Sequence, residues 1–458
     1  MSVESSPLEP GDLAVVLGLG IAGRAVATAL VKRGISVTAI EDRPTDEMAE
    51  FANSVGCTFI GSAERATFDE LFESAVAFVP SPGVPEHHVA FAAVRESDVR
   101  TISEFDIARW FDDRPIAAIT GTDGKTSVTM LTVAMLEASG VAAAAVGNTD
   151  VPLVEVIDAP EYDVFVVEAS SFRLGHAEEF APTAAAWLNF SPDHLDVHES
   201  LAHYEAAKAK IWANLAPGGL AVAPIDDPVV RSHLPKGSAH DIITVATSPG
   251  EGANAFVEDG RLLVDGVDIG PFEALPRTFD HDVTNTLVAG ALALRLGATA
   301  AGIERAIRTH VLAPHRIQHV ATQNDIAFYN DSKATVPHAV NTAISGFESV
   351  VLIAGGKNKG LDLSEMAESV DRIRSVVALG DAADEVAAAF DGLRPVERAR
   401  DMTAAVTAAA AAAESGDVVL LSPGFASVDQ YENYGARGDD FIRIVGELMI
   451  KDRVEIEQ

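Results

Sequence analysis

Short apolar runs alternate with stretches of helical periodicity along most of the chain. Most of these runs lead into Gly, Ser, Asn or Glu, which is typical of buried strands that end in turns. Strands are predicted at residues 13–17, 36–40, 116–120, 164–168, 185–189, 350–354, 375–379 and 418–421. Their alternation with helices indicates βαβ units and parallel sheets.

Helices are predicted between these strands, at residues 25–32, 127–138, 199–215 and 403–413. The stretch 199–215 is amphipathic, because five apolar residues share one helical face: Leu201, Tyr204, Ala207, Ile211 and Leu215. Residues 403–413 are nearly all alanine. We interpret them as a helix rather than as disorder, since alanine is the best helix former.

The composition is strongly acidic, with 33 Lys and Arg against 68 Asp and Glu and a formal net charge of −35. Nucleic acid is therefore disfavoured as a partner. The acidity fits either a salty cytoplasm or a need for solubility alone. No apolar run approaches the roughly 20 residues of a membrane span, and the polar N-terminus lacks the basic flank of a secretory signal. We expect a cytoplasmic, monomeric protein that is not membrane-embedded. Its single cysteine, Cys57, cannot form an internal disulfide framework.

A glycine turn between a predicted strand and a predicted helix carries the strongest chemical signal. Residues 119–126 read Ile-Thr-Gly-Thr-Asp-Gly-Lys-Thr. Backbone N–H groups, the Lys125 charge and the helix N-terminus suit phosphate, and the Thr126 hydroxyl suits Mg²⁺. The match to a general phosphate loop is incomplete, because Ile119 stands where that pattern has glycine. An ordinary strand-to-helix turn is the alternative.

A second glycine turn, Gly18-Leu19-Gly20-Ile21-Ala22-Gly23, follows the first predicted strand. Its spacing fits a dinucleotide fingerprint, with Glu41 about 20 residues further on. A turn of this kind holds any pyrophosphate, so NAD and UDP both remain open, and Arg43 would face a phosphate or a base edge. A tight turn without a ligand is the third possibility.

Three side chains near predicted strand ends could hold a metal ion. Glu168 ends a buried strand, where a carboxylate could ligate Mg²⁺ or simply pair with a lysine. His194 could ligate a metal, although a lone histidine is more often structural. Lys208 borders the apolar face of its helix, so its pKa should fall and its neutral amine could take up CO₂ as a carbamate. Most lysines in such a position only extend to water.

The motifs taken together resemble the Mur ligase family over essentially the whole chain. The resemblance rests on the two glycine turns and on further motifs that run from 81 to 438: Ser81-Pro82-Gly83, Gly147-Asn148, Glu168-Ala169-Ser170-Ser171-Phe172, Asp193-His194, Ala206-Ala207-Lys208, His281–Asn285, His315-Arg316, Asn330–Thr335, Ser422–Gln430, Asn433 and Arg437-Gly438. The segment Asn330–Thr335 is similar to the corresponding motif in the branch of the family that adds D-glutamate.

This resemblance implies an α/β fold with three domains. Rossmann-like N- and C-terminal domains, residues 1–113 and 313–458, would flank a central ATPase domain of the P-loop type, residues 114–312. The implied reaction joins D-glutamate to UDP-N-acetylmuramoyl-L-alanine through an acyl phosphate, with ATP and two Mg²⁺ ions, in peptidoglycan precursor synthesis.

The resemblance also implies roles for individual residues. Catalysis would involve Lys125, Glu168, His194 and carbamylated Lys208, and the metal ligands would be Thr126, Glu168, His194 and Lys208. ATP would be held by Gly121, Thr122, Asp123, Gly124, Lys125, Thr126, Ser127, Asn285, Arg316 and Asp331. The UDP-sugar would be held by Gly18, Leu19, Gly20, Ile21, Ala22, Gly23, Asp42, Arg43, Ser81, Gly83, Asn148, Ser170 and Arg173. D-Glutamate would contact Asp193, Lys333, Thr335, Lys359, Ser427, Val428 and Tyr434.

Three positions depart from the family pattern. Asp123 stands where asparagine is common, Arg173 where glutamine usually contacts the sugar, and Gln318 where an acid is common. These departures leave open a related ligase that uses L-glutamate or another amino acid. A nicotinamide-dependent dehydrogenase would leave the phosphate loop and the C-terminal domain, residues 313–458, unexplained. A non-catalytic nucleotide-binding protein would not need Lys125, Glu168, His194 and Lys208 together.

Overall fold

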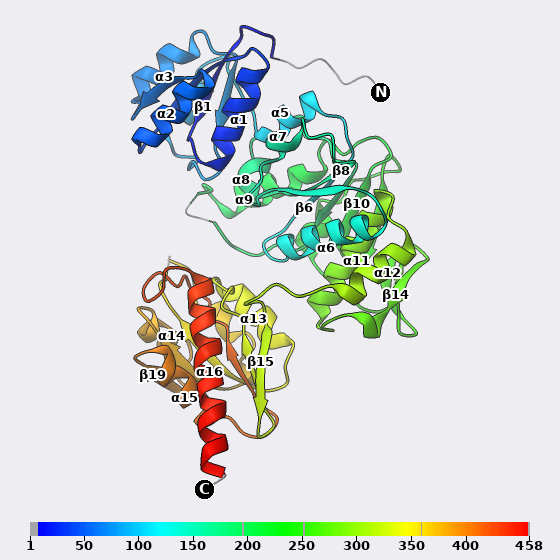
Figure 1. Ribbon diagram of the computed structural model, residues 1–458, viewed down its shortest axis with the longest axis vertical. Helices are drawn as coiled ribbons and strands as arrows, with labels where there is room; N and C mark the ends of the chain where they lie inside the picture. The colour runs from blue at the N-terminus through cyan, green and yellow to red at the C-terminus, as the bar shows by residue number, and fades with distance from the viewer. Residues whose placement is uncertain (1–7, 195–196, 251, 359, 457–458) are drawn as a thin grey trace. The chain divides into compact units, whose positions relative to one another are not determined.

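The structure is a computed structural model that describes residues 8–194, 197–250, 252–358 and 360–456. The chain divides into two compact units, Met1–His310 and Val311–Gln458, which are described separately below (Figure 1). In the described part of the chain, no helix is long and apolar enough to cross a membrane.

The first sheet belongs to the N-terminal unit and is parallel throughout, with the strand order β3-β2-β1-β4-β5. Its strands are β1 (Leu13–Leu17), β2 (Ser36–Glu41), β3 (Thr58–Gly61), β4 (Ala77–Pro80) and β5 (Arg100–Thr101). Its helices are α1 (Ile21–Lys32), α2 (Asp46–Val55), α3 (Arg65–Phe72), α4 (Val89–Arg95) and α5 (Glu104–Phe111). Val15 and Leu17 of β1 enter one apolar cluster and Ala14 and Val16 another, so the strand is buried on both faces.

The second sheet also belongs to this unit and has the strand order β14-β13-β12-β11-β10-β9-β6-β8-β7. Its strands are β6 (Ile116–Thr120), β7 (Ala143–Gly147), β8 (Val164–Glu168), β9 (Ala184–Trp187), β10 (Leu220–Pro224), β11 (Asp241–Val245), β12 (Ala255–Glu258), β13 (Arg261–Val264) and β14 (Val267–Pro271). Its helices are α6 (Lys125–Ala138), α7 (Leu153–Val156), α8 (Ser171–Leu174), α9 (Leu201–Ala209), α10 (Pro228–Ser232), α11 (Asp280–Arg295) and α12 (Ala300–Thr309), with 3₁₀ turns at Lys210–Trp212 and Phe272–Ala274. Strand β13 pairs antiparallel with both β12 and β14. Helix α6 packs against α11 and α12 (Figure 1).

Strand β6 lies between β8 and β9 and runs parallel to both. The carboxyl ends of these three strands therefore meet at one edge of the sheet. Open α/β sheets bind their ligands at such an edge, outside the strand ends. The polar segments after β6, β8 and β9 gather there, which places the phosphate-loop sequence beside Glu168.

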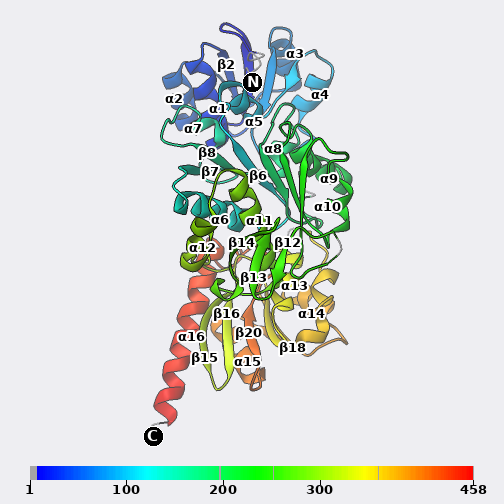
Figure 2. The same cartoon turned by 90° about the vertical axis from the view of Figure 1, so that its right-hand side faces the viewer.

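The third sheet forms the C-terminal unit, with the strand order β15-β16-β20-β17-β18-β19. Its strands are β15 (Gln318–Gln323), β16 (Ile326–Asn330), β17 (Val350–Gly355), β18 (Ile373–Leu379), β19 (Val396–Ala399) and β20 (Val418–Leu421). Its helices are α13 (Pro337–Ser345), α14 (Ala383–Ala389), α15 (Met402–Ala412) and α16 (Tyr434–Ile456), with 3₁₀ turns at Ser364–Ala367 and Val370–Arg372. Helices α15 and α16 pack together against this sheet (Figure 2).

Each predicted strand is present, although β9 ends at Trp187 instead of residue 189 and β18 begins at Ile373 instead of residue 375. The alanine-rich stretch is helical, as expected. One helix was predicted too long. The stretch 199–215 contains α9, which ends at Ala209 and continues only as the 3₁₀ turn Lys210–Trp212. Pro217 and the two glycines after it disfavour further helix. The domain boundaries at residues 113 and 312 remain predictions.

Candidate active site

The phosphate-loop sequence forms a turn between β6 and α6. Gly124 caps the helix in a left-handed conformation with φ of 82°, which glycine adopts without strain. Lys125 begins α6, and its Nζ donates to the carbonyl oxygens of Gly121 and Thr122, both at 2.8 Å. Thr126 and Ser127 follow in the first turn. A 14-residue helix whose N-terminus follows such a turn suits an anion.

Asn189, which follows β9, holds this turn in place. Its Oδ1 accepts hydrogen bonds from the backbone N–H groups of Thr122 and Asp123, both at 2.9 Å. Asn285 of α11 lies on the other side, because a Cβ built on Gly124 would be 3.1 Å from its Oδ1. The sequence singled out Asn285 but not Asn189. The sequence signal for Asn189 is its place as the last residue of the strand predicted at 185–189.

Glu168 is buried at the end of β8, with an exposure of 3%. Its Oε1 accepts a hydrogen bond from Asn148 Nδ2 at 3.0 Å, while its buried Oε2 has no hydrogen-bond partner among the residues that the structure describes. A buried carboxylate oxygen without a donor is costly unless a cation compensates it. The donor set therefore fits a divalent cation that prefers oxygen ligands, such as Mg²⁺.

Lys208 of α9 is buried against the phosphate loop, with an exposure of 1%. Its Nζ donates to the Gly121 carbonyl at 2.7 Å and lies 4.5 Å from the centre of the Tyr204 ring. Burial, followed by the nearby positive charge of Lys125, lowers the pKa of Lys208 well below its ordinary value. The sequence predicted partial desolvation, and the burial is nearly complete.

His194 approaches the same region from the loop after β9. Its backbone is left-handed, with φ of 54°, which is uncommon for a residue other than glycine. Asp193 Oδ1 accepts from the His194 N–H at 2.7 Å, and Asp193 Oδ2 lies 3.3 Å from His194 Nε2. The His194 ring packs edge-on against Phe172, with centroids 4.8 Å apart. The Glu168 carboxylate at the end of β8, the His194 imidazole after β9 and Lys208 on α9 thus come from three separate segments.

The first glycine turn, residues 18–23, is closed by Ser81. Ser81 Oγ donates to the Gly18 carbonyl at 2.7 Å, and a Cβ at Gly23 would lie 1.9 Å from that oxygen. Glu41 Oε2 accepts from the Leu19 N–H at 2.9 Å, so the acid of the fingerprint is bound to the turn itself. Asp42, proposed for the UDP-sugar, lies 3.2 Å from His88 Nε2, whereas Arg43 is exposed.

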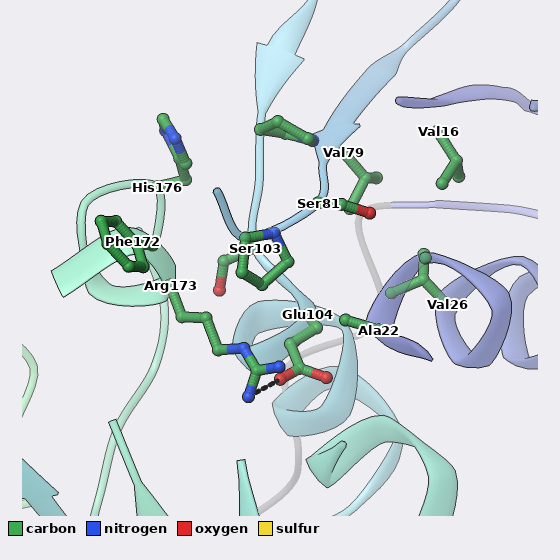
Figure 3. A pocket seen from close by; sticks show the side chains of 13 residues that line it. Val16, Ala22, Val26, Val79, Ser81, Ser103, Glu104, Phe172, Arg173 and His176 are labelled. Carbon is green, nitrogen blue, oxygen red and sulfur yellow. Dashed lines mark ion pairs between the residues drawn. The ribbon is translucent and has the colours of Figure 1, made fainter. Parts of the chain in front are cut away.

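A small cavity lies between this turn and α8. Its lining includes Gly23, Ser81 and Ser103 from the first sheet's elements and Phe172 from α8 (Figure 3). Arg173 and Glu104 also line it, 3.1 Å apart and both buried. Within the described part of the chain, both Glu104 oxygens and the Arg173 Nε and Nη1 lack a hydrogen bond of good geometry. The position where the family's glutamine was expected to contact sugar therefore carries a buried ion pair.

This ion pair makes stability pH-dependent. Burial raises the pKa of Glu104 from 4.5 to about 7, although Arg173 opposes the rise. Because folding raises this pKa, the contribution of Glu104 is fully stabilising below about pH 4.5 and is lost as pH rises through about 7. In the double variant Glu104→Gln/Arg173→Gln we expect a smaller fall in unfolding midpoint between pH 5 and pH 8, measured by scanning calorimetry. An unchanged fall would contradict this assignment.

The C-terminal unit holds most of the residues expected to bind the amino acid. It also holds Asp331, which was expected to bind ATP. Asp331 is buried, and its carboxylate accepts from the Ile317 N–H at 3.1 Å and from Ser422 Oγ at 2.8 Å. Lys333 Nζ lies 5.5 Å from the centre of the Tyr434 ring. Thr335 is half-buried, Ser427 is buried and Val428 is exposed. Lys359 lies outside the described residues.

Arg437 is a buried cation of this unit, and the sequence analysis assigned no role to it. It donates to the Ser332 carbonyl at 2.8 Å and to the Phe425 carbonyl at 3.1 Å. Burial lowers its pKa to about 10. Arg437 therefore joins the loop after β16 to the loop after β20, which carry Lys333 and Ser427. Only the family motif marked it, because its partners lie far away in the sequence.

Comparison with known proteins identifies the family to which the chain belongs. Residues 119–293 match the Mur ligase middle domain, and residues 315–425 match the Mur ligase, glutamate ligase domain. The UDP-N-acetylmuramoylalanine–D-glutamate ligase of Frankia casuarinae is 37% identical over 94% of this chain and 93% of its own length. The enzyme of the same name from Salinibacter ruber is 36% identical over 95% of this chain and 98% of its own.

Solved structures show the same fold at low sequence identity. A pseudomurein peptide ligase type C from Methanothermus fervidus is 17% identical, with a TM-score of 0.59 over 96% of this chain and 100% of that one. The MurF ligase of Thermotoga maritima, solved in complex with ADP, is 15% identical, with a TM-score of 0.58 over 98% of each chain. The predicted α/β fold class is confirmed.

Fold and site together define a nucleotide-dependent ligase of the Mur type. By its matches along nearly the whole length, the chain belongs to the Mur ligase family, in the branch of the UDP-N-acetylmuramoylalanine–D-glutamate ligases.

Proposed function

We propose that this protein is an ATP-dependent ligase that joins D-glutamate to UDP-N-acetylmuramoyl-L-alanine, a step of peptidoglycan precursor synthesis. The observation that carries the proposal is the identity of 37% with a D-glutamate ligase over 94% of the chain. The phosphate loop, the buried Glu168 and the buried Lys208 support it, because they supply the groups that such a reaction needs.

The chemistry follows from the poor reactivity of a carboxylate toward amines. A carboxylate oxygen of the substrate attacks the γ-phosphorus of ATP, ADP leaves, and an acyl phosphate forms. The amine of D-glutamate then attacks the carbonyl carbon and loses a proton, and phosphate leaves with the former carboxylate oxygen. Charge builds up on phosphate oxygens in the first step, so a cation at the phosphate loop lowers the barrier.

Several residues in and near the phosphate loop would bind ATP. Lys125, whose Nζ already points to the loop carbonyls, would turn to the phosphates when ATP enters. The N–H groups of the α6 N-terminus would bind the same oxygens. Asn285 beside Gly124 would contact ATP, and we assign Arg316 and Asp331 of the C-terminal unit to ATP as well.

Glu168, His194, Thr126 and Lys208 would hold Mg²⁺, which neutralises phosphate charge when it is bound. The unpartnered Oε2 of Glu168 supports this assignment. The lowered pKa of Lys208 favours its neutral amine, which can add to CO₂ with loss of a proton. The resulting carbamate would give an oxygen ligand in place of a buried neutral amine.

The UDP-sugar and D-glutamate are assigned to two different sets of residues. The turn at 18–23 would hold the UDP part, together with Asp42, Arg43, Ser81, Gly83, Asn148, Ser170 and Arg173. Asp193, Lys333, Thr335, Lys359, Ser427, Val428 and Tyr434 would take D-glutamate. D-Glutamate carries two carboxylates and enters a protein of net charge −35, so local cations are needed to attract it.

Phosphate release tests the proposal. With Mg²⁺·ATP, UDP-N-acetylmuramoyl-L-alanine and D-glutamate, we expect phosphate and the amide product, and no release when any one substrate is left out. L-Glutamate serves as the matched control and should react much more slowly. Faster release with L-glutamate would assign the chain to a related ligase, and no release with either isomer would overturn the proposed activity.

A further inference from the structure

His198 is a buried histidine that has no role in the activity described above. Its side chain is 2% exposed, and both ring nitrogens are engaged. Nδ1 lies 2.8 Å from Glu86 Oε1, and Nε2 lies 2.9 Å from Ser171 Oγ. A carboxylate only accepts hydrogen bonds, so Nδ1 carries a proton. In the neutral ring, Nε2 then accepts from the Ser171 hydroxyl.

The ring of His198 also packs against aromatic side chains of the candidate active site. It stacks on Phe172, with centroids 5.5 Å apart and an interplanar angle of 17°. Phe172 also contacts the edge of the His194 ring, with centroids 4.8 Å apart. His198 lies 5.4 Å from the ring of Tyr204, which stands one helical turn before Lys208 on α9. Its backbone N–H donates to the His194 carbonyl at 3.1 Å.

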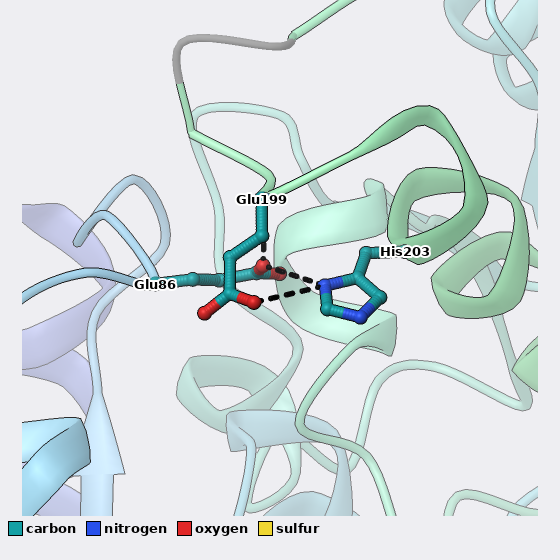
Figure 4. A group of neighbouring side chains, drawn as sticks. All are labelled: Glu86, Glu199 and His203. Atoms are coloured by element: carbon teal, nitrogen blue, oxygen red, sulfur yellow. Dashed lines mark hydrogen bonds and ion pairs between the residues drawn. The ribbon is translucent and has the colours of Figure 1, made fainter.

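Glu86, the other end of this contact, comes from the chain after β4 and not from the central sheet. Its Oε2 accepts from the Glu199 N–H at 3.0 Å and lies 3.5 Å from His203 Nδ1 (Figure 4). Burial raises the pKa of Glu86, but the Glu199 amide and His198 outweigh it and hold this pKa below its ordinary value. Glu86 is therefore a fixed negative partner for the His198 ring.

We infer that His198 is a positioning residue that fixes His194 and α8 relative to α9, and so sets the geometry of the Glu168, His194 and Lys208 group. Ser171 follows Glu168 by three residues, and Tyr204 precedes Lys208 by four, so His198 touches each of the three segments that supply that group. Through Glu86 it also ties them to the part of the chain that carries the first glycine turn. The inference rests on the proposed function.

The test compares His198→Ala with His203→Ala in the full-length protein. His203 faces the same carboxylate, but its side chain is 54% exposed, and no aromatic or Ser171 contact is found for it among the described residues. We expect kcat of His198→Ala to fall about 10–100-fold, as for groups that orient metal ligands, with His203→Ala within about twofold of wild type. His198→Asn, whose amide can donate to Glu86, should recover part of the loss.

Binding separates positioning from a general loss of structure. Mn²⁺ added with ADP, and followed by electron paramagnetic resonance without turnover, should bind about tenfold more weakly to His198→Ala. Glu86→Gln, at a partly exposed position, should weaken Mn²⁺ in the same direction and be non-additive with His198→Ala. Unchanged kcat and Mn²⁺ affinity in both variants would overturn the inference. Absence of wild-type turnover, in contrast, would overturn the proposed function alone.

Discussion

Replacement of Lys208 by alanine should lower kcat by about 10²–10³-fold, the effect of removing one group that stabilises transition-state charge. Lys208 is a buried side chain, and its Nζ donates to the Gly121 carbonyl of the phosphate loop. Lys210→Ala is the matched control, because Lys210 Nζ contacts the Gly175 carbonyl at 2.7 Å and Glu178 at the surface. Steady-state phosphate release should place that control within about twofold of wild type.

Acetate should restore part of the activity of Lys208→Ala. The lost side chain leaves room for a small carboxylate, whose oxygens would replace those of the carbamate. Intact-protein mass spectra of wild type, recorded under bicarbonate and native conditions, should show the added CO₂. An unmodified Lys208 in a bicarbonate-saturated and fully active enzyme would contradict the carbamate and assign the role of Lys208 to its amine.

Replacement of Lys125 by alanine should also lower kcat by about 10²–10³-fold, or about 2.7–4 kcal/mol of transition-state stabilisation. Affinity for the UDP-sugar, measured by calorimetry, should stay near the wild-type value. The reason is that Lys125 lies in the turn after β6, while the proposed UDP contacts begin at the turn after β1.

The control for Lys125 is Lys32→Ala, which removes an exposed lysine paired with Asp158. It should change neither kcat nor UDP-sugar affinity. If Lys125→Ala weakened UDP-sugar binding as much as it lowered kcat, the phosphate loop would serve the sugar nucleotide, and the assignment of the two glycine turns would be wrong.

The pattern of apolar residues predicted best the strands and helices whose formation depends on neighbouring residues in the sequence. Strands such as Ile116–Thr120 and Val164–Glu168 were predicted to the residue, because buried parallel strands read as uninterrupted apolar runs. The position of Lys208 beside an apolar helical face indicated partial desolvation, and the nearly complete burial was not predicted. The length of its helix was predicted less well, since a downstream proline and two glycines compete with the amphipathic pattern.

Contacts between distant segments could not be read from the sequence. Asn189 supports a turn 66 residues earlier, and Glu86 meets a histidine 112 residues later. Arg173 pairs with Glu104 of α5, which lies 69 residues earlier in the chain, and its contact with the sugar remains a prediction. Such pairs depend on how sheets and loops pack, and a single sequence carries no record of that packing.

The most direct test of the account follows the oxygen atoms of the substrate carboxylate. UDP-N-acetylmuramoyl-L-alanine labelled with ¹⁸O in that carboxylate is incubated with Mg²⁺·ATP and D-glutamate, and the phosphate is analysed by mass spectrometry. An acyl-phosphate route predicts one ¹⁸O in each phosphate released, because the activated oxygen leaves with phosphorus. Unlabelled phosphate formed along with the amide product would contradict the account.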